Sequence, residues 1–438
     1  MTKIAIDFSK ELGKIKPMHA VNNGPAKPSK LFSENSNFDA YKEANIPYAR
    51  NHDASHNHNY GGDRTVDINA IFHNFDNDPY DPASYDFACT DEYIERTLSA
   101  GTKIFYRLGN SIDHRVKKYS SAVPTDFKKW AVICEHIIMH YNEGWADGFH
   151  YNIEYWEIWN EPDLGDQCWL GTLDEFLELF KITATHLKER FPHLKIGGPA
   201  MTGEGVFDWL DDFLRYMRDN NVPLDFYSWH AYRSEPRAFE PFIMRARELL
   251  DKYGYTETEH NMNEWNYVSG WGKEFRDSIR TIISMKGAAF TAATMALCQN
   301  LPIDMLMYYD ARSNCTMNGL FSVYTYEKLK GYYPFPMFAK LYAIGTQLPA
   351  ETDDADIYPV AASDGKTSAI MITYFTNDTD ATAKSLELDL KAIPHKEMNI
   401  FLLDEDHDAE NMGTVIPESE SLRIEIKPNS VILLENNI

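Results

Sequence analysis

Short apolar segments alternate with amphipathic helical segments along most of the chain, and this alternation limits the possible folds more than any other feature. From about residue 17 to 345, each β-like segment is followed by a stretch with helical periodicity. Eight strands are predicted, at His19–Asn23, Ile46–His52, Lys103–Leu108, Tyr155–Asn160, Leu194–Gly198, Asp225–Tyr232, Thr258–Trp265 and Asp304–Asp310. Eight strands that each lead into a helix predict an α/β fold, the (β/α)₈ TIM barrel. A doubly wound sheet is the alternative, but no G-x-G-x-x-G motif follows an early strand.

Helical periodicity between these strands predicts the outer layer of the barrel. The helices are expected at Thr90–Ala100, Asp126–Tyr141, Leu173–Phe191, Phe207–Asn220, Arg237–Tyr253 and Ser278–Asn300. The sequence from Thr172 to Glu175 has the pattern of a capping box, which marks the start of one of them.

The sequence changes character after about residue 350, where alternating β-type runs are separated by turn residues. We therefore predict that residues 17–348 form the catalytic barrel and residues 349–438 an accessory β-sandwich. Residues 1–16 are expected to contribute a strand to this sandwich.

The formal net charge of −24 comes from 66 acidic and 42 basic residues. An acidic surface repels phosphate backbones and anionic lipids, so we expect no nucleic-acid partner and no membrane partner. The N-terminal segment lacks an apolar h-region, and the five cysteines are odd in number and scattered. These features favour a cytoplasmic protein with reduced thiols, although a mature chain whose signal peptide had been removed would look the same.

Glu161 is the first candidate catalytic residue, because it follows an apolar, aromatic strand that ends abruptly at Pro162. Chemistry in a (β/α)₈ barrel occurs at the rim formed by the C-terminal ends of the strands. A carboxyl group flanked there by Trp159 and an apolar strand end is expected to have a raised pKa, as a general acid needs. The alternative is a solvated side chain at a simple turn.

A second carboxyl group, Glu264, lies in the alternating segment from Thr256 to Asn266, which ends in Glu264-Trp265-Asn266, about three strand–helix units later. This spacing places Glu161 on the fourth strand and Glu264 on the seventh, on opposite sides of the rim. Two opposed carboxyl groups suit glycoside hydrolysis: one protonates the leaving oxygen, while the other attacks the anomeric carbon or activates water. Glu259 is the rival on the same strand, and a salt-bridged structural role is the alternative for Glu264.

Five further motifs occur in order along the chain. They are His19–Pro25 (H-A-V-N-N-G-P), Arg50–Asp53 (R-N-H-D), Trp156–Pro162 (W-E-I-W-N-E-P), Ile196–Pro199 (I-G-G-P) and Ser228–Tyr232 (S-W-H-A-Y). Together with the two carboxyl groups, they resemble the retaining (β/α)₈ glycosidases typified by family 5, and more closely the family 39 glycoside hydrolases. That family includes β-xylosidases and α-L-iduronidases, and its members carry a β-sandwich beside the barrel.

The resemblance implies a double displacement with retained anomeric configuration, in which Glu161 is the acid/base and Glu264 the nucleophile. Asn160 would then donate to the sugar 2-hydroxyl, a contact that strengthens in the transition state. It also implies that Tyr232 orients the nucleophile and that His230 contacts the sugar. It implies no cofactor.

Several other side chains are candidates to line the sugar pocket. His52 and Asp53 follow the second strand and would bind sugar hydroxyls; a metal site is the alternative for this His-rich segment, and we expect none. Tyr309 ends the eighth strand and would form the pocket floor, with aromatic packing as the alternative. Arg107 would pair with a carboxylate near the site or form a structural salt bridge. Candidate sugar-stacking residues are Trp145, Trp169 and Trp271.

The leading hypothesis is a retaining exo-glycosidase, β-xylosidase-like, that hydrolyses terminal sugars of plant-derived oligosaccharides. α-L-Arabinofuranosidase, β-galactosidase or β-glucosidase activity, or endo-acting glycanase activity, remains open because subsite loops decide the sugar. A non-catalytic carbohydrate-binding protein is the alternative from another class. The expected partner is an oligosaccharide substrate, with a homo-oligomer as an open possibility.

Overall fold

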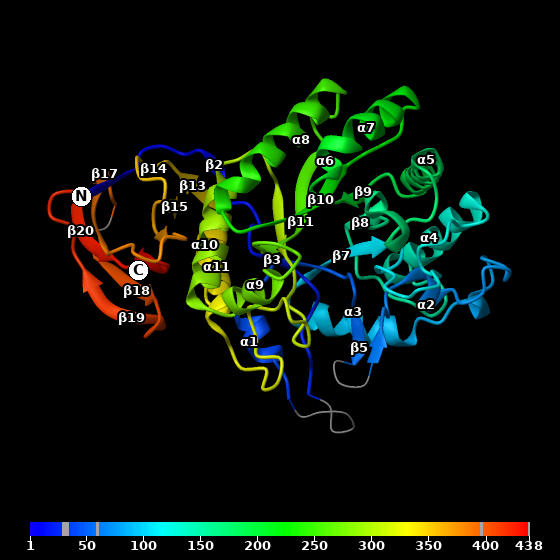
Figure 1. The fold of residues 1–438 in the computed structure, drawn as a ribbon, viewed down its shortest axis with the longest axis horizontal. Helices are drawn as coiled ribbons and strands as arrows, with labels where there is room; N and C mark the ends of the chain where they lie inside the picture. The colour runs from blue at the N-terminus through cyan, green and yellow to red at the C-terminus, as the bar shows by residue number, and fades with distance from the viewer. Residues whose placement is uncertain (29–34, 58–60, 395–396, 437–438) are drawn as a thin grey trace.

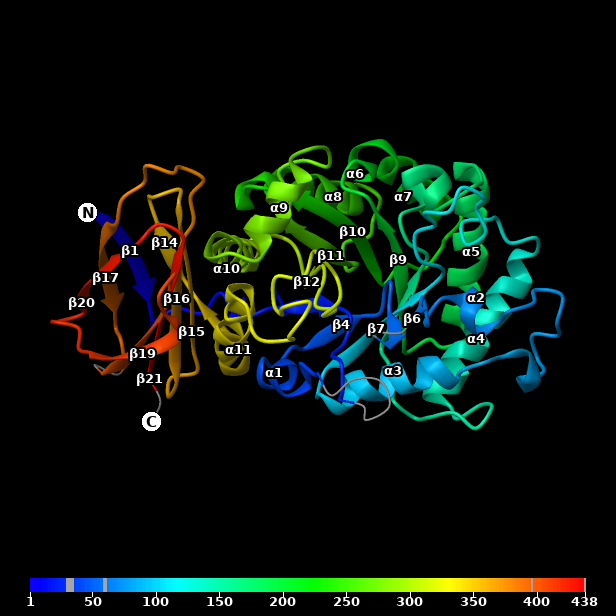
Figure 2. The same cartoon turned by 60° about the horizontal axis from the view of Figure 1, so that its bottom comes forward.

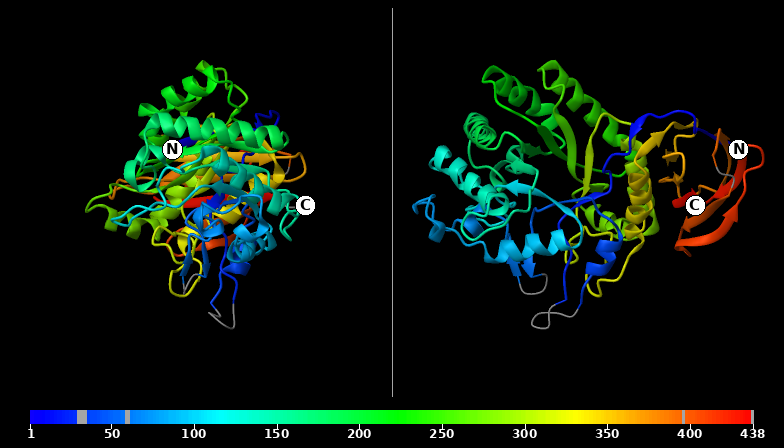
Figure 3. Two further views of the ribbon diagram at one scale, coloured as in Figure 1. Left: turned by 90° about the vertical axis from the view of Figure 1, so that its right-hand side faces the viewer. Right: turned by 180° about the vertical axis from the view of Figure 1, so that it is seen from behind.

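The computed structural model describes residues 1–28, 35–57, 61–394 and 397–436. A large unit of strands ringed by helices stands beside a smaller unit made of β-sheets (Figure 1). The N-terminus and the last described residues both lie in the smaller unit (Figure 3).

The large unit is a closed barrel of parallel strands, which confirms the predicted fold. Among the described residues its strands follow one another around the barrel in the order β3, β4, β7, β8, β9, β10, β11 and β12, and β12 pairs with β3. Their bounds are β3 Ala20–Asn22, β4 Tyr48–Arg50, β7 Lys103–Leu108, β8 Tyr155–Ile158, β9 Lys195–Met201, β10 Phe226–Arg233, β11 Glu259–Tyr267 and β12 Met305–Tyr308. Most residues of these strands are buried on both faces, because one face fills the barrel and the other packs under the helices.

Helices surround the barrel and cover the outer face of its strands (Figure 2). Their bounds are α1 Phe38–Glu43, α2 Ile68–Ile71, α3 Ala88–Ser99, α4 Phe127–Asn142, α5 Leu173–Arg190, α6 Gly205–Asp208, α7 Leu210–Asp219, α8 Glu240–Lys252, α9 Phe275–Ile282, α10 Met285–Gln299 and α11 Pro334–Ile344. Short 3₁₀ helices are η1 Pro82–Ser84, η2 Pro162–Gln167, η3 Pro236–Phe239 and η4 Lys330–Tyr332. The capping box at Thr172 and Glu175 is present at the start of α5. A hairpin of β5 Ser55–Asn57 and β6 Gly61–Asp63 follows β4.

The smaller unit consists of two β-sheets, which confirms the predicted all-β C-terminal region. In the described chain one sheet has the order β14 Ala350–Thr352, β1 Thr2–Asp7, β17 Lys384–Lys391 and β20 Ser421–Ile426. The other has the order β19 Asp408–Val415, β18 Met398–Leu403, β21 Ser430–Asn436, β16 Ser368–Tyr374, β15 Ile357–Ser363, β13 Thr346–Leu348 and β2 Gly13–Lys14. Both sheets thus include a strand from the first sixteen residues, and pairing in the larger sheet starts at Thr346.

The two units share packed surfaces. Helices α10 and α11 lie between the barrel strands and the larger sheet (Figure 2), where α10 contacts β15, β16 and β21. Phe290 of α10 meets Phe375, just after β16, with ring centroids 5.7 Å apart. One continuous apolar core therefore extends from the barrel helices into the larger sheet.

Within the described residues, no single helix is long and apolar enough to span a membrane. Helices α9 and α10 reach the necessary length and apolar character only when taken together, and the pair is bent by 81°.

Candidate active site

Glu161 lies just beyond the C-terminal end of β8, where the chain turns sharply into η2. Its backbone is left-handed, with φ 47° and ψ 52°, and its N–H donates to the carbonyl oxygen of Ala200 on β9 at 2.9 Å. Pro162 begins η2 immediately afterwards, because its fixed φ suits the first helical position. The turn leaves the Glu161 side chain 14% exposed and directed into the barrel mouth.

Glu264 lies within β11, across the mouth from Glu161, and is almost completely buried. Its Oε1 accepts a hydrogen bond from Nη1 of Arg50 at 2.7 Å, and its Oε2 accepts one from the Tyr232 hydroxyl at 2.7 Å. Both oxygens are thus held by donors on other strands. These contacts stabilise the ionised carboxylate and fix its orientation.

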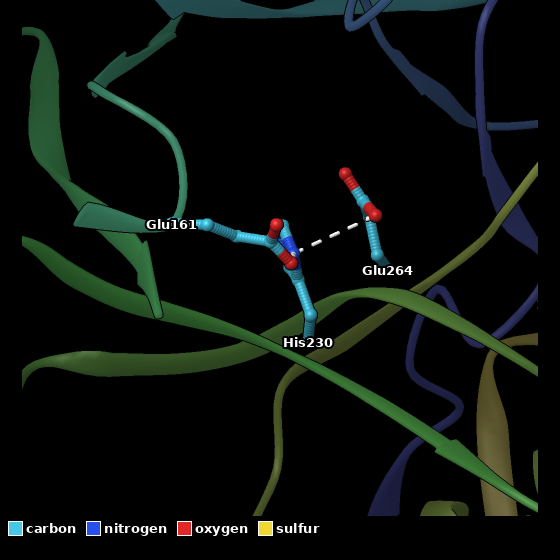
Figure 4. Close-up of side chains that lie close together, drawn as sticks. All are labelled: Glu161, His230 and Glu264. Atoms are coloured by element: carbon cyan, nitrogen blue, oxygen red, sulfur yellow. Dashed lines mark hydrogen bonds and ion pairs between the residues drawn. The ribbon is translucent and has the colours of Figure 1, made fainter. Parts of the chain in front are cut away.

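His230 on β10 lies between the two carboxyl groups (Figure 4). Its Nδ1 is 2.7 Å from Oε1 of Glu161 and 3.5 Å from Oε2 of Glu264. One oxygen of each glutamate and this nitrogen all lie within 4.8 Å of one another. Side chains at such spacing can hold a metal ion, or can exchange a proton with a molecule bound between them.

Arg50, at the end of β4, connects the pieces of the site through its fully buried guanidinium. It donates from Nε to Glu157 at 2.6 Å, from Nη1 to Glu264 at 2.7 Å and from Nη2 to the amide oxygen of Asn160 at 2.7 Å. Glu157 also accepts from Ser228 at 2.6 Å. The sequence interpretation quoted Arg50 only as part of a motif and missed this role. A lone arginine ending an apolar strand, with a glutamate inside the fourth strand, was the available signal.

The mouth of the barrel contains a pocket of about 620 Å³. Among the described residues it is lined by the candidates Glu161, Glu264, His52, Asp53, His230, Tyr232 and Tyr309. Asn160 lies directly behind this lining, buried against Arg50. The structure thus brings together these eight of the side chains that the sequence proposed for the site.

Asp53 and Tyr309 form one wall of this pocket. The Tyr309 hydroxyl donates to Oδ2 of Asp53 at 3.0 Å, and the backbone oxygen of Asp53 accepts from Arg312. Burial acts to raise the pKa of Asp53, but His52, Arg312 and the Tyr309 hydroxyl together lower it below its ordinary value. Asp53 is therefore an ionised acceptor at neutral pH, suited to sugar hydroxyls.

The two glutamates differ in their surroundings. Burial, together with the charges of Asp163 and Asp53, raises the pKa of Glu161 to about 8, against the opposing effect of Arg50. Burial also raises the pKa of Glu264, but His230, Arg50 and the Tyr232 hydroxyl counteract it. Burial lowers the pKa of His230 to about 4, so its imidazole is neutral at pH 7. Glu161 is therefore the protonated partner of the pair at neutral pH.

Other candidates from the sequence lie outside the pocket. Glu259 is at the opposite end of β11, where it binds Lys195 at 2.6 Å and the Tyr155 hydroxyl at 2.9 Å, so it does not compete with Glu264. Arg107 forms a buried salt bridge with Asp67 at 2.6 Å, the structural alternative.

The three candidate tryptophans have different surroundings. Trp145 packs against Tyr85 and His136, and Trp169 is buried against Trp159. Only Trp271, of these three, lines the pocket; it is 62% exposed, with its ring 5.1 Å from that of Tyr232. Its ring also stacks on Phe275 at 5.3 Å, and its exposed part is suited to contact with a sugar.

Comparison with known proteins identifies relatives of this chain. The family model described as Glycosyl hydrolases family 39 matches residues 2–269. The β-xylosidase of Geobacillus stearothermophilus is 32% identical over 178 residues, which cover 38% of this chain and 34% of that protein. The β-xylosidase of Caldicellulosiruptor saccharolyticus is 27% identical over 246 residues, which cover 53% of this chain and 46% of that protein. The chain thus spans less than half the length of these curated relatives.

The fold is shared with solved structures over its full length. The crystal structure of a glucosidase from Croceicoccus marinus superposes with a TM-score of 0.81 and 23% sequence identity. The match covers 100% of this chain and 99% of that one, so it includes the β-sheets as well as the barrel.

Proposed function

The chain belongs to family 39 of the glycosyl hydrolases, and we propose that it is a retaining exo-glycosidase of β-xylosidase type. Its substrates would be short plant-derived oligosaccharides, from which it removes the terminal sugar. The two curated relatives named β-xylosidase support this choice of sugar. The glucosidase that shares the fold makes a β-glucosidase the second candidate.

The separation of the two carboxyl groups carries the proposal of retention. Carboxyl groups about 5–5.5 Å apart suit retaining enzymes, whereas inverting enzymes need about 6.5–9.5 Å to admit a water molecule. Oxygens of Glu161 and Glu264 lie within 4.8 Å of each other, which favours direct attack by one of them on the sugar.

In the first step, Glu264 attacks the anomeric carbon while Glu161 gives its proton to the leaving oxygen. Glu161 can serve as the acid because its pKa of about 8 keeps it protonated at neutral pH. A covalent glycosyl–Glu264 intermediate forms, and the aglycone leaves as an alcohol. In the second step Glu161, now ionised, takes a proton from water, and the water oxygen displaces Glu264 from the sugar.

Neighbouring side chains would bind and orient the sugar. Arg50 holds the amide oxygen of Asn160, which leaves the amide N–H groups of Asn160 to donate to the 2-hydroxyl. Asp53 and His52, on the pocket wall, would accept from the other hydroxyls. Trp271 would provide an apolar face for a sugar at the open side of the pocket.

The test uses a panel of p-nitrophenyl glycosides, including the β-xyloside and β-glucoside, with Glu161→Gln and Glu264→Gln in parallel. We expect turnover on the β-xyloside, with both variants at least about 1,000-fold slower. Glu259→Gln makes the same change on the same strand at the other end of the barrel, and should stay active. NMR of the first-formed product should show the β-anomer. An α-anomer would refute retention, and inactivity of the folded parent on every glycoside would refute the proposed substrates.

A further inference from the structure

Asp163 lies two residues after Glu161 and lines the same pocket, yet the reaction above gives it no role. It is largely shielded from solvent and sits in the first turn of η2. A carboxyl group this close to the proposed acid raises the question of what holds it there.

Asp163 connects the segment that carries Glu161 to the neighbouring strand. Its Oδ1 and Oδ2 accept from the backbone N–H of Thr202 at 3.1 and 3.2 Å, and its Oδ2 also accepts from the Thr202 hydroxyl. Thr202 follows the last residue of β9. The N–H of Glu161 also donates to the carbonyl oxygen of Ala200 on β9. The segment that carries the acid is therefore bound to the end of β9 at two points, Glu161 and Asp163.

The surrounding backbone leaves space for this carboxylate. A side-chain carbon at Gly205 would lie 2.1 Å from Oδ2 of Asp163, so any larger residue there would displace it. Gly205 is buried at the start of α6, and its N–H donates to the Thr202 hydroxyl at 3.2 Å. Asp163, Thr202 and Gly205 thus form one fitted contact beside Glu161.

The charges that face the acid come from several strands. Glu161 faces the charges of Arg50 and Asp53 from β4 and the segment after it, and it also lies beside His230 on β10 and Glu264 on β11. Of these, Arg50 lowers the pKa of Glu161, whereas Asp53 raises it.

Asp163 influences Glu161 electrostatically from the same segment of chain. After burial, its charge is the largest influence that raises the pKa of Glu161. Burial raises the pKa of Asp163 above its ordinary value against the donors of Thr202, which lower it, and Asp208 on α6 adds a smaller rise.

We propose that Asp163 is a positioning residue for the acid/base: it anchors the Glu161 segment to the end of β9 and places a second negative charge beside the acid. This inference rests on the proposed function for its catalytic consequence, but not for its structural one. It explains why a partly buried acidic residue occupies a pocket wall next to the proton donor.

The first test reads the proton on Glu161 without turnover. Protein labelled with ¹³C at the glutamate carboxyl carbons is titrated by NMR, and Glu161→Gln assigns the signal. Asp163→Asn keeps one oxygen to accept from Thr202 but removes the charge, so Glu161 should titrate about 1 pH unit lower. Asp166→Asn makes the same change on the exposed side of η2 and should leave the titration in place. An unmoved Glu161 titration in Asp163→Asn would overturn the electrostatic part of the proposal.

The second test separates anchoring from charge in the folded enzyme. Asp163→Ala should lower kcat about 100-fold with KM changed less than about threefold, because a displaced acid affects chemistry more than binding. Thr202→Val, which removes the hydroxyl donor without changing the charge, should lower kcat by a smaller factor and serves as the second variant if Asp163→Ala does not fold. Unchanged kcat in both would refute the anchoring role. An inactive parent would instead count against the proposed function, while the NMR titration would still report on Asp163.

Discussion

Arg50 links the two proposed catalytic carboxyl groups through its hydrogen bonds. Its guanidinium donates hydrogen bonds to Glu264 and to Asn160, and Asn160 immediately precedes Glu161. These contacts, together with those to Glu157 and Asn22, need a planar donor group with several N–H bonds in fixed directions. A lysine carries the same charge but cannot make them simultaneously.

We therefore expect Arg50→Lys to lower kcat/KM by at least about 100-fold, comparable to the loss of one electrostatic contact in a water-excluded site. Steady-state kinetics on the best p-nitrophenyl glycoside measures this effect. Arg107→Lys is the matched control: an equally buried arginine on the next strand, paired with Asp67 outside the pocket. It should lower the melting temperature but keep the kcat of the folded enzyme. Equal losses of activity in both variants would mean that Arg50 is only structural.

The pH dependence follows from the two glutamates. kcat/KM should fall above pH 8, as Glu161 loses the proton it must donate, and below the pKa of Glu264, as the nucleophile becomes protonated. The Tyr232 hydroxyl lowers the pKa of Glu264, so Tyr232→Phe should move the acid limb upward by about 0.5–1 pH unit. The alkaline limb should stay in place.

Tyr309→Phe provides the comparison, because it also removes one pocket hydroxyl but from Asp53. Tyr309→Phe should raise KM, and the acid limb of its pH–rate profile should lie at the same pH as in the parent enzyme. A pH–rate profile of each variant checks this. If the two substitutions shift the acid limb equally, the hydrogen bond to Glu264 is not the cause.

Among the individual site residues, the sequence predicts some and misses others for a physical reason. Glu161 could be found because it follows an apolar strand, and Glu264 because it lies near the end of a strand with alternating residues. The network around Arg50 joins the ends of three strands that are far apart in sequence. Asp163 looks like an ordinary residue of a turn until the end of β9 is placed beside it.

Among the secondary-structure elements, the helix predicted at Ser278–Asn300 is two helices, α9 and α10, bent by 81° at Ile283 and Ser284. Helical periodicity continues through the bend, so the sequence pattern did not reveal it. Ser284 begins α10 in an extended conformation, and its hydroxyl donates to the carbonyl oxygen of Thr281 at 2.8 Å. The helix predicted at Phe207–Asn220 is likewise divided, into α6 and α7, at Trp209.

Gly287 makes this bend possible. A side-chain carbon there would lie 2.4 Å from the carbonyl oxygen of Thr281 and 2.6 Å from that of Ile282. Gly287→Ala should therefore destabilise the protein by about 1–3 kcal/mol, although alanine favours helices by about 1 kcal/mol over glycine. Gly272→Ala is the control, since its new methyl group would meet only the flexible end of Glu274. Chemical denaturation measures both; a Gly287→Ala variant as stable as the parent would show that the bend tolerates a side chain.

In the whole molecule, the barrel and the β-sheets share one apolar core rather than meeting at a polar surface. Interfaces of that kind make two units unfold together, whereas small polar interfaces let domains behave independently. The N-terminal strand β1 strengthens the connection, because it pairs with β14 and β17 and the chain then continues into the barrel. The sequence predicted that β1 joins this unit, but the depth of the shared core depends on side chains from distant helices and strands.

We therefore expect a single cooperative unfolding transition in calorimetry, with activity lost over the same temperature range. Phe375→Ala, which removes the ring packed on Phe290 across the interface, should lower stability by about 3–5 kcal/mol and shift both curves together. Leu388→Ala changes the core between the two sheets, and the described residues of that core include none from the barrel. If the units are coupled, Leu388→Ala must also shift the loss of activity. If instead activity survives a first transition that Leu388→Ala moves alone, the sheets unfold independently, and the shared core does not couple them.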